Sequence, residues 1–398
     1  MQFLHPSRLL CILLLLPLSL LANQDSSAVR ISLLTCSRGA DLYSTYGHSA
    51  IRVVDTIQKT DKVYNYGTFS FADPDFYWKF TRGKLPYYLN IERMDNFMSI
   101  YVEEGRGVIE QVFLLTPTEA NQITTYLDNN VKEENKYYKY DFLIDNCSTR
   151  IRDIFQKSFQ TQFVLGKVIA EDSMSFRKIL NYYERNLHWE RVGINTLMSQ
   201  VVDRNMSNAE STFLPDYLMQ AFDHATLHGR KIVSEKHELL KATYQEKNTI
   251  NYPFVIFTCL FIFFILMNFK KHTQAILIYF DILLFLLVGL LGFFILFMWL
   301  GTEHQVCGWN INLLWAFPLH IFFAVLLSIK SDNVTHYARY AKWLIILLIF
   351  YNIFSVQKLI IETLPLVLTL YIRLRNYSQQ NFYFSKFKKS YATNIKGI

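Results

Sequence analysis

The chain has 398 residues, of which 51% are hydrophobic and only 18% are charged. This charge content is low for a soluble protein of such length, and the average conceals two halves of different character. Up to about residue 249 the chain mixes apolar, aromatic and charged residues, whereas beyond residue 252 long apolar runs alternate with short polar segments. The net charge of +7 would suit a nucleic-acid partner, but the Lys and Arg residues gather beside the apolar runs, which indicates membrane topology instead.

The first 22 residues have the pattern of a secretory signal. Arg8 precedes an apolar stretch over residues 9–21, and cleavage is expected after Ala22. Leu20 occupies the position where signal peptidase prefers a small residue, so the pattern indicates export more directly than cleavage. The domain that follows is therefore expected outside the cytoplasm.

Residues 23–165 predict an α+β domain. Period-2 runs of apolar and β-branched residues predict strands at residues 30–35, 47–54, 62–67, 85–92 and 107–115. Residues 72–84, rich in Asp, Pro and aromatics, predict a short helix or a loop. Thr116 caps a helix that runs to about residue 129.

A cysteine lies at the start of the next predicted helix, residues 149–158. The segment 140–153 reads Y-D-F-L-I-D-N-C-S-T-R-I-R-D, so Asp145 and Asn146 are suited to cap that helix. Cys147 then lies against the positive end of the helix dipole, where the thiolate is favoured and the residue can be a nucleophile near neutral pH. The alternative is a small buried cysteine in the first turn of the helix.

A cysteine nucleophile needs a base, which is usually histidine. His188, His224, His228 and His237 lie on segments with ordinary helical patterning and carry no site signal. His48 differs, because it follows Gly47 and begins a predicted strand, where the backbone is rigid and another element can approach closely. The alternative for His48 is a core histidine bonded to a backbone carbonyl.

The five cysteines limit the other classes of site. They are Cys11, Cys36, Cys147, Cys259 and Cys307. No C-x-x-C spacing occurs, so the pattern does not favour zinc or iron–sulfur sites, and no cofactor is expected. A disulfide between Cys36 and Cys147 is an alternative that would remove the nucleophile.

Residues 166–249 predict a helical extension that forms a packing layer or an arm over the membrane. Apolar spacing of i, i+3, i+4 predicts helices at residues 174–186, 195–203, 215–228 and 230–245.

Residues 250–378 predict a membrane domain of five spans. Each apolar segment has close to the ~20 residues needed to cross hydrocarbon; they are residues 252–269, 275–299, 310–329, 341–357 and 359–375. Lys and Arg follow the first, third and fifth segments, which predicts an outer N-terminal domain and a cytoplasmic basic tail over residues 379–398. The fourth and fifth segments could instead fuse or form a re-entrant pair. Asp281 and Glu362 lie inside spans and either pair internally or line a polar cavity.

The loop at residues 301–309 gathers ionisable groups at the outer edge of the membrane. Thr302, His304, Asn310 and Asn312 make up a candidate membrane-face site, with a solvated polar loop as the alternative.

Several motifs resemble one known family. Y-G-H-S-A-I-R-V (46–53), V-Y-N-Y-G-T-F (63–69), D-N-C-S-T-R-I-R-D (145–153) and F-L-P-D-Y-L (213–218) resemble the Lnb N-terminal periplasmic domain family. G-T-E-H-Q (301–305) and N-I-N-L-L (310–314) resemble the Lnb-type transmembrane domain. The resemblance implies an α+β fold similar to circularly permuted papain-like domains, in which the histidine strand precedes the cysteine helix, as it does here.

The resemblance also implies an activity, lipoprotein N-acylation in the inner membrane of a bacterium. Cys147 would take an acyl chain from a glycerol ester and pass it to the amine of a lipoprotein's N-terminal cysteine, with His48 as base and acid. Asn65 is the candidate to orient the imidazole, with Asp55 and Tyr64 as alternatives.

Backbone N–H groups of the Cys147 helix, supported by Asn146 and Ser148, would hold the oxyanion. The substrates would be lipoproteins and membrane lipid. Two other readings stay open: a cell-wall cysteine peptidase or amidase on the same architecture, and a membrane-anchored binding protein with an inert Cys147.

Overall fold

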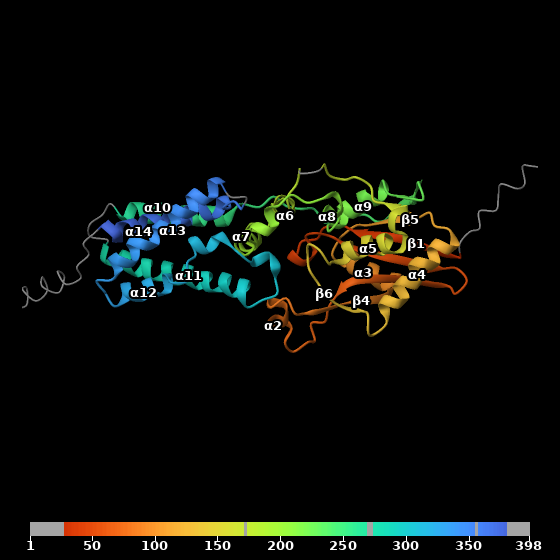
Figure 1. Ribbon diagram of the computed structural model, residues 1–398, viewed down its shortest axis with the longest axis horizontal. Helices are drawn as coiled ribbons and strands as arrows, with labels where there is room; N and C mark the ends of the chain where they lie inside the picture. Colours follow the sequence, from red (N-terminus) through yellow and green to blue (C-terminus); the bar gives the residue numbers. More distant parts are fainter. Residues whose placement is uncertain (1–27, 171–172, 269–273, 355–356, 380–398) are drawn as a thin grey trace, which may run out of the picture.

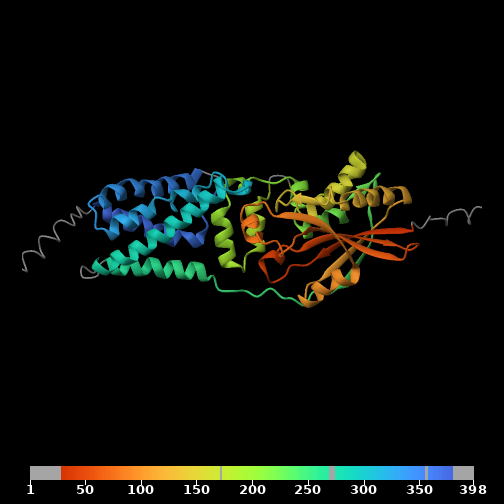
Figure 2. The same cartoon turned by 90° about the horizontal axis from the view of Figure 1, so that it is seen from below.

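The computed structural model describes residues 28–170, 173–268, 274–354 and 357–379. The expected signal segment (residues 1–22), Lys270 and Lys271, and the basic tail from residue 380 lie outside these ranges. The molecule is elongated: an α+β domain and a bundle of helices lie end to end, with the helical extension between them (Figure 1 and Figure 2).

A seven-stranded antiparallel sheet forms the outer domain, with strand order β10-β5-β1-β2-β3-β4-β6. The strands are β1 (Val29–Cys36), β2 (His48–Asp55), β3 (Thr60–Thr68), β4 (Pro86–Arg93), β5 (Val108–Phe113), β6 (Tyr137–Lys139) and β10 (Val233–Leu240). The first five match the predicted strands to within two residues at each end. The alternation of apolar side chains was therefore sufficient to predict these five strands from the sequence.

Helices cover both faces of this sheet because its central strands are apolar on both. Ile31, Leu33 and Ile51 face a core shared with α4 (Pro117–Val131), α5 (Cys147–Phe159) and α9 (Pro215–Asp223). Leu34 and Ala50 face the opposite core, which is closed by α3 (Met94–Glu103). The sequence did not predict α3.

The helical extension differs from its prediction in several places, one of which is that the helix predicted over residues 215–228 already ends at Asp223, before a short strand at Thr226–Leu227. It contains α6 (Phe176–Tyr183), α7 (His188–Leu197), η3 (Gln200–Asp203) and α8 (Asn208–Ser211), followed by α9. The predicted helix over residues 195–203 is divided between the end of α7 and η3, which Ser199 caps.

The predicted helix over residues 230–245 is wrong, because this stretch contains β9 (Arg230–Lys231) and β10. These apolar residues fit helical spacing, but β10 satisfies its backbone by pairing with the open edge of β5. Its middle residues are charged and exposed, as is common on edge strands. β9 completes a small sheet with β7 (Phe163–Val164) and β8 (Thr226–Leu227).

Five α-helices occupy the described part of the membrane half. They are α10 (Tyr252–Asn268), α11 (Gln274–Leu300), α12 (His320–Ser328), α13 (Val334–Phe354) and α14 (Leu364–Gln379). Two stretches in these helices are long and apolar enough to cross a membrane, Ile276–Leu300 and Val334–Phe354, and α10 is a shorter apolar helix.

One of the predicted spans is much shorter than expected as a helix, and the last two differ from their predicted bounds. In the third, residues 310–329, α12 begins only at His320 because η6 (Ile311–Leu314) and a turn occupy the first half. The last two spans belong to separate helices, since α13 ends at Phe354 and η7 (Ile361–Thr363) precedes α14. α13 begins at Val334, seven residues before the predicted start.

A buried ion pair joins α11 to α14. Both Asp281 and Arg373 are almost fully buried, and Arg373 donates from Nε and Nη2 to the two oxygens of Asp281 at 2.8 and 2.6 Å. The Tyr377 hydroxyl donates to the same carboxylate at 2.6 Å. Of the two alternatives from the sequence, Asp281 therefore pairs internally.

The membrane half is fastened to α7 and the turn that follows it. Asn310 donates to the carbonyls of Thr196 and Leu197 at 2.8 and 2.9 Å, and Asn312 donates to that of Thr196 at 3.0 Å. Glu362 forms an ion pair with Arg191 of α7. These contacts fix the outer domain relative to the helical bundle.

Removing one partner of the buried ion pair should destabilise the helical bundle. We expect Arg373→Met to lower the free energy of unfolding by about 3–5 kcal/mol, because Asp281 is left buried without its counter-charge. Thermal unfolding of the purified protein in detergent measures the loss. Arg375→Met, which removes an exposed arginine from the same helix, serves as the control. The double variant Asp281→Leu/Arg373→Met should recover most of the stability, and an equal loss in the double variant would contradict this account.

Candidate active site

Cys147 is the first residue of α5, and its neighbours fix the helix start. The side-chain oxygen of Asn146 accepts the N–H groups of Ser148 and Thr149 at 2.9 and 3.0 Å, and the Thr149 hydroxyl accepts the N–H of Asn146 at 2.8 Å. This reciprocal capping box holds the first turn rigid. Cys147 is buried, with only 7% of the residue exposed.

The side-chain amide of Asn146 already uses its N–H donors within the fold. Its amide nitrogen donates to the carbonyls of Phe142 and Phe213 at 2.6 and 2.9 Å. The expected role of Asn146 in holding an oxyanion is therefore restricted to positioning the helix. The N–H of Cys147 lies at the positive end of α5, where a negative charge is stabilised.

Ser148 connects α5 to the histidine strand. Its buried hydroxyl lies 3.0 Å from that of Ser49, the residue after His48, and 3.9 Å from the sulfur of Cys147. Ser148 thus sets the spacing between the cysteine helix and β2.

His48 begins β2 and is oriented by Asn65 on β3. Its Nε2 lies 2.7 Å from Oδ1 of Asn65, whose Nδ2 donates to Glu92 on β4 at 2.9 Å. Because Asn65 presents its oxygen, Nε2 is the nitrogen that carries the proton, which leaves Nδ1 to face Cys147. The two alternatives are engaged elsewhere: Asp55 accepts two N–H groups of the next turn, and Tyr64 donates to Asp128.

Cys147 and His48 each shift the pKa of the other toward the charged form. Burial would raise the pKa of Cys147, but the charge and hydrogen bond of His48, the N–H of Ser49 and the Ser148 hydroxyl bring it below the ordinary value of 9.0. Burial would lower the pKa of His48, but Cys147 and Asn65 raise it above 6.5. Each of the two side chains therefore favours the charged form of the other.

Cys36 provides the contrast. It lies opposite His48 in the sheet, and burial raises the pKa of its thiol to about 12. Cys36 and Cys147 are both free thiols, so the alternative of a disulfide between them is wrong.

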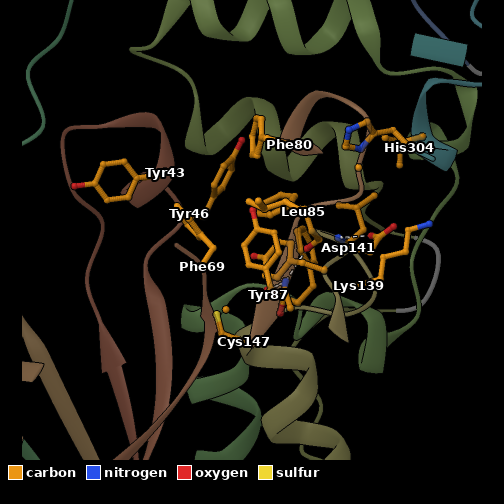
Figure 3. A pocket seen from close by; sticks show the side chains of 18 of the residues that line it. Tyr43, Tyr46, Phe69, Phe80, Leu85, Tyr87, Lys139, Asp141, Cys147 and His304 are labelled. Carbon is orange, nitrogen blue, oxygen red and sulfur yellow. Dashed lines mark hydrogen bonds between the residues drawn. The ribbon is translucent and has the colours of Figure 1, made fainter. Parts of the chain in front are cut away.

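A cavity of about 470 Å³ leads to the thiol. Cys147 lies at one end in Figure 3, and Phe80 and His304 lie at the other. The walls between them are mostly aromatic or aliphatic and include Tyr46, Tyr66, Phe69, Leu85, Tyr87, Tyr140, Phe142 and Phe213. A cavity of this volume and character suits an apolar ligand of moderate size.

The membrane half completes this cavity with the loop that follows α11. Glu303, His304, Gln305 and Val306 all line it. His304 Nε2 lies 3.1 Å from the carbonyl of Thr81, and Glu303 pairs with Lys84 and Lys139 of the outer domain. The cavity is therefore shared between the two halves of the chain.

Only part of the predicted membrane-face site reaches the cavity. His304 does, whereas the Thr302 hydroxyl donates back to its own helix at Met298, and Asn310 and Asn312 are buried against the extension. Neither the contact of Glu92 with Asn65 nor the aromatic walls of the cavity was predicted from the sequence. The density of Tyr and Phe over residues 63–87 and 137–142 was the available signal for the walls.

Comparisons with known proteins identify two family models. Residues 19–181 match the Lnb N-terminal periplasmic domain, and residues 245–382 match the Lnb transmembrane domain. Together the two matches cover well over half of the chain. No curated protein and no solved structure matches it.

The first prediction for this site concerns the pH dependence of thiol alkylation. We expect the rate of Cys147 modification by iodoacetamide to rise through an inflection below pH 9.0, because His48 lowers the pKa of the thiol. In His48→Ala the largest effect that opposes burial is removed, so the inflection should move upward and the rate at pH 7 should fall about tenfold, the factor for one pKa unit. Mass spectrometry of the Cys147 peptide gives the rates. Cys36 should stay unmodified, and an unchanged inflection in His48→Ala would contradict the pairing.

The second prediction tests the role of Asn65. In Asn65→Ala the imidazolium loses its acceptor, so the pKa of His48 should fall and the pKa of Cys147 should rise. Alkylation at pH 6–7 should then slow by roughly tenfold, as expected for about one pKa unit. Tyr64→Phe is the control, since it removes a hydrogen bond from the adjacent residue of the same strand. Equal effects of the two variants would show that Asn65 supports only the fold.

Proposed function

The chain belongs to the Lnb family, and we propose that it transfers an acyl chain from a glycerol ester to the N-terminal amine of a lipoprotein through a thioester on Cys147. The family domains make it an inner-membrane protein with a periplasmic N-terminal domain. One observation carries the proposal: a histidine-paired thiol lies at the end of an apolar cavity that a loop of the membrane half completes.

In the first step the thiolate of Cys147 attacks the ester carbonyl. The S–C bond forms and the bond from that carbon to the glycerol oxygen breaks, while Nδ1 of protonated His48 gives its proton to the departing alkoxide. The N–H of Cys147 and the positive end of α5 stabilise the negative charge on the carbonyl oxygen. The products are a thioester and a free glycerol hydroxyl.

In the second step the neutral amine of the lipoprotein attacks the thioester. Neutral His48 accepts the proton of the amine, an amide bond forms, and the S–C bond breaks to restore the thiolate. Asn65 keeps the imidazole turned so that the same Nδ1 serves both steps. The sum is conversion of an ester and an amine into an amide and an alcohol.

A relation to circularly permuted papain-like domains is part of the same proposal. The order of the three polar residues along the chain, His48, Asn65 and Cys147, supports it, as does the hydrogen bond of an asparagine to the imidazole. We also propose a cytoplasmic C-terminus, on the distribution of Lys and Arg.

The two alternative functions, a cell-wall peptidase or amidase and a binding protein, fit this site less well. A cell-wall peptidase or amidase could use the same cysteine and histidine, but a polar peptide substrate does not account for an aromatic cavity shared with a membrane domain. A binding protein with an inert cysteine does not account for the pKa of Cys147 below its ordinary value.

Reconstitution with a diacylated lipopeptide tests the proposal. We expect the protein in liposomes to produce an N-acylated peptide, detected by mass spectrometry. Cys147→Ala should abolish the product because no thioester can form, and His48→Ala should lower kcat by about 10²–10⁴-fold, the range for loss of a general acid–base. Cys36→Ala, which removes the other thiol of the outer domain, should retain activity. Undiminished acylation by Cys147→Ala would refute the mechanism, and cleavage of cell-wall peptides instead would favour the peptidase reading.

A further inference from the structure

The short helix α2 (Phe76–Thr81) and the turn before it expose an unusual number of aromatic rings. Phe71 is 74% exposed, Tyr77 81%, Trp78 56% and Phe80 53%. Contiguous apolar patches of this kind mark contact surfaces when they occur on a folded domain. Each of these four residues is more than half exposed, and the surface they form is called the α2 patch below.

The α2 patch lies at the level where the membrane half begins. Trp78 stacks on Phe297 in the last turns of the apolar stretch Ile276–Leu300, with ring centroids 6.1 Å apart. Arg82, just after α2, donates to the carbonyl of Gly301 at 3.3 Å and accepts the N–H of Glu303 at 3.0 Å. Figure 1 shows α2 beside the end of α11.

Other aromatic residues mark the same level. Trp309 is 72% exposed, and its ring lies 4.9 Å from that of Trp299 near the end of α11. Tryptophan and tyrosine concentrate where a membrane protein crosses the boundary between hydrocarbon and water. The α2 patch therefore continues the apolar surface of the span to the bilayer surface.

The inner side of α2 faces the cavity. Phe80 and Gly83 both line it, and Phe80 lies at the end remote from Cys147 (Figure 3). Gly83 has a φ of +67°, and a Cβ there would lie 3.2 Å from the ring of His304, so the loop of the membrane half can approach closely only because this residue is glycine. α2 thus separates the bilayer surface from the route to the thiol.

We propose that α2 forms a lateral portal through which one acyl chain of a bilayer-resident glycerol ester enters the cavity beside Phe80 and reaches Cys147. This inference rests on the proposed function and names the direction from which its acyl donor arrives. The continuity of the α2 patch with the apolar surface of α11 favours a lipid chain over a peptide as the occupant. The ester would leave its glycerol at the bilayer surface while the chain follows the aromatic walls.

Photo-crosslinking identifies the occupant. p-Benzoylphenylalanine is placed at Tyr77, at Phe80 or, as the control, at Ile57, which is 78% exposed in the turn between β2 and β3 at the far end of the sheet. The full-length protein is irradiated in phosphatidylglycerol vesicles. We expect lipid adducts at positions 77 and 80 and none at 57. Adducts to polypeptide, or equal lipid labelling at position 57, would overturn the portal.

A second measurement separates the access of lipid to the cavity from the reactivity of Cys147. Tyr77→Asp places a charge at the bilayer surface and should lower acyl transfer from vesicle lipid by up to about fivefold, in line with the cost of a charged group near the interface. Alkylation of Cys147 by iodoacetamide, which needs no membrane route, should stay within about twofold of the original rate, as for a surface substitution. Ile57→Asp should change neither rate.

The possible results distinguish the two proposals. Wild-type acyl transfer by both Tyr77→Asp and Phe80→Trp, which narrows the entrance, would overturn the portal and leave the proposed function intact. Lipid adducts at positions 77 and 80 without any N-acylated product would overturn the proposed function and leave a lipid-binding portal.

Discussion

The buried pair of Cys147 and His48 is the interaction on which the outer domain depends for any chemistry. A thiol as deeply buried as Cys147 would ordinarily be inert, and Cys36 in the same domain shows this, since burial raises its pKa to about 12. The difference lies in what faces each sulfur. Cys147 has an imidazole and the positive end of a helix, so the charged form is stabilised where burial alone would suppress it.

The remaining structure holds these two groups at a fixed separation. The capping box of Asn146 and Thr149 sets the start of α5, and the Ser148–Ser49 contact sets its distance from β2. Asn65 and Glu92 extend the support across two further strands. These polar groups therefore hold Cys147 and His48 in position, as a preorganised site requires.

The same site depends on the membrane half for its outer wall. Asn310 and Asn312 bind the last turn of α7, and Glu362 binds Arg191, so the membrane half is held against the extension. His304 and Glu303 hold their loop against Thr81 and Lys139 of the outer domain. Once that loop is in place, the cavity lies between the thiol and the apolar end of α11. This placement suits the proposed reaction, in which a lipid ester and a periplasmic amine both reach the thiol.

The sequence by itself determined the five main strands, the cysteine helix and the pairing of His48 with Cys147, because strand alternation, helix capping and motif resemblance are local signals. It also identified Asn65 among three candidates, although only the register of β2 and β3 brings Asn65 to the imidazole and turns Tyr64 toward Asp128. Tertiary structure decided three other features: the strand β10, the helix α3 and the irregular first half of the third apolar segment. In β10 the open edge of β5 supplied backbone partners that outweighed helical spacing. The cavity likewise exists only in the folded chain, since its walls combine residues near 46, 80, 140 and 304 that no local pattern connects.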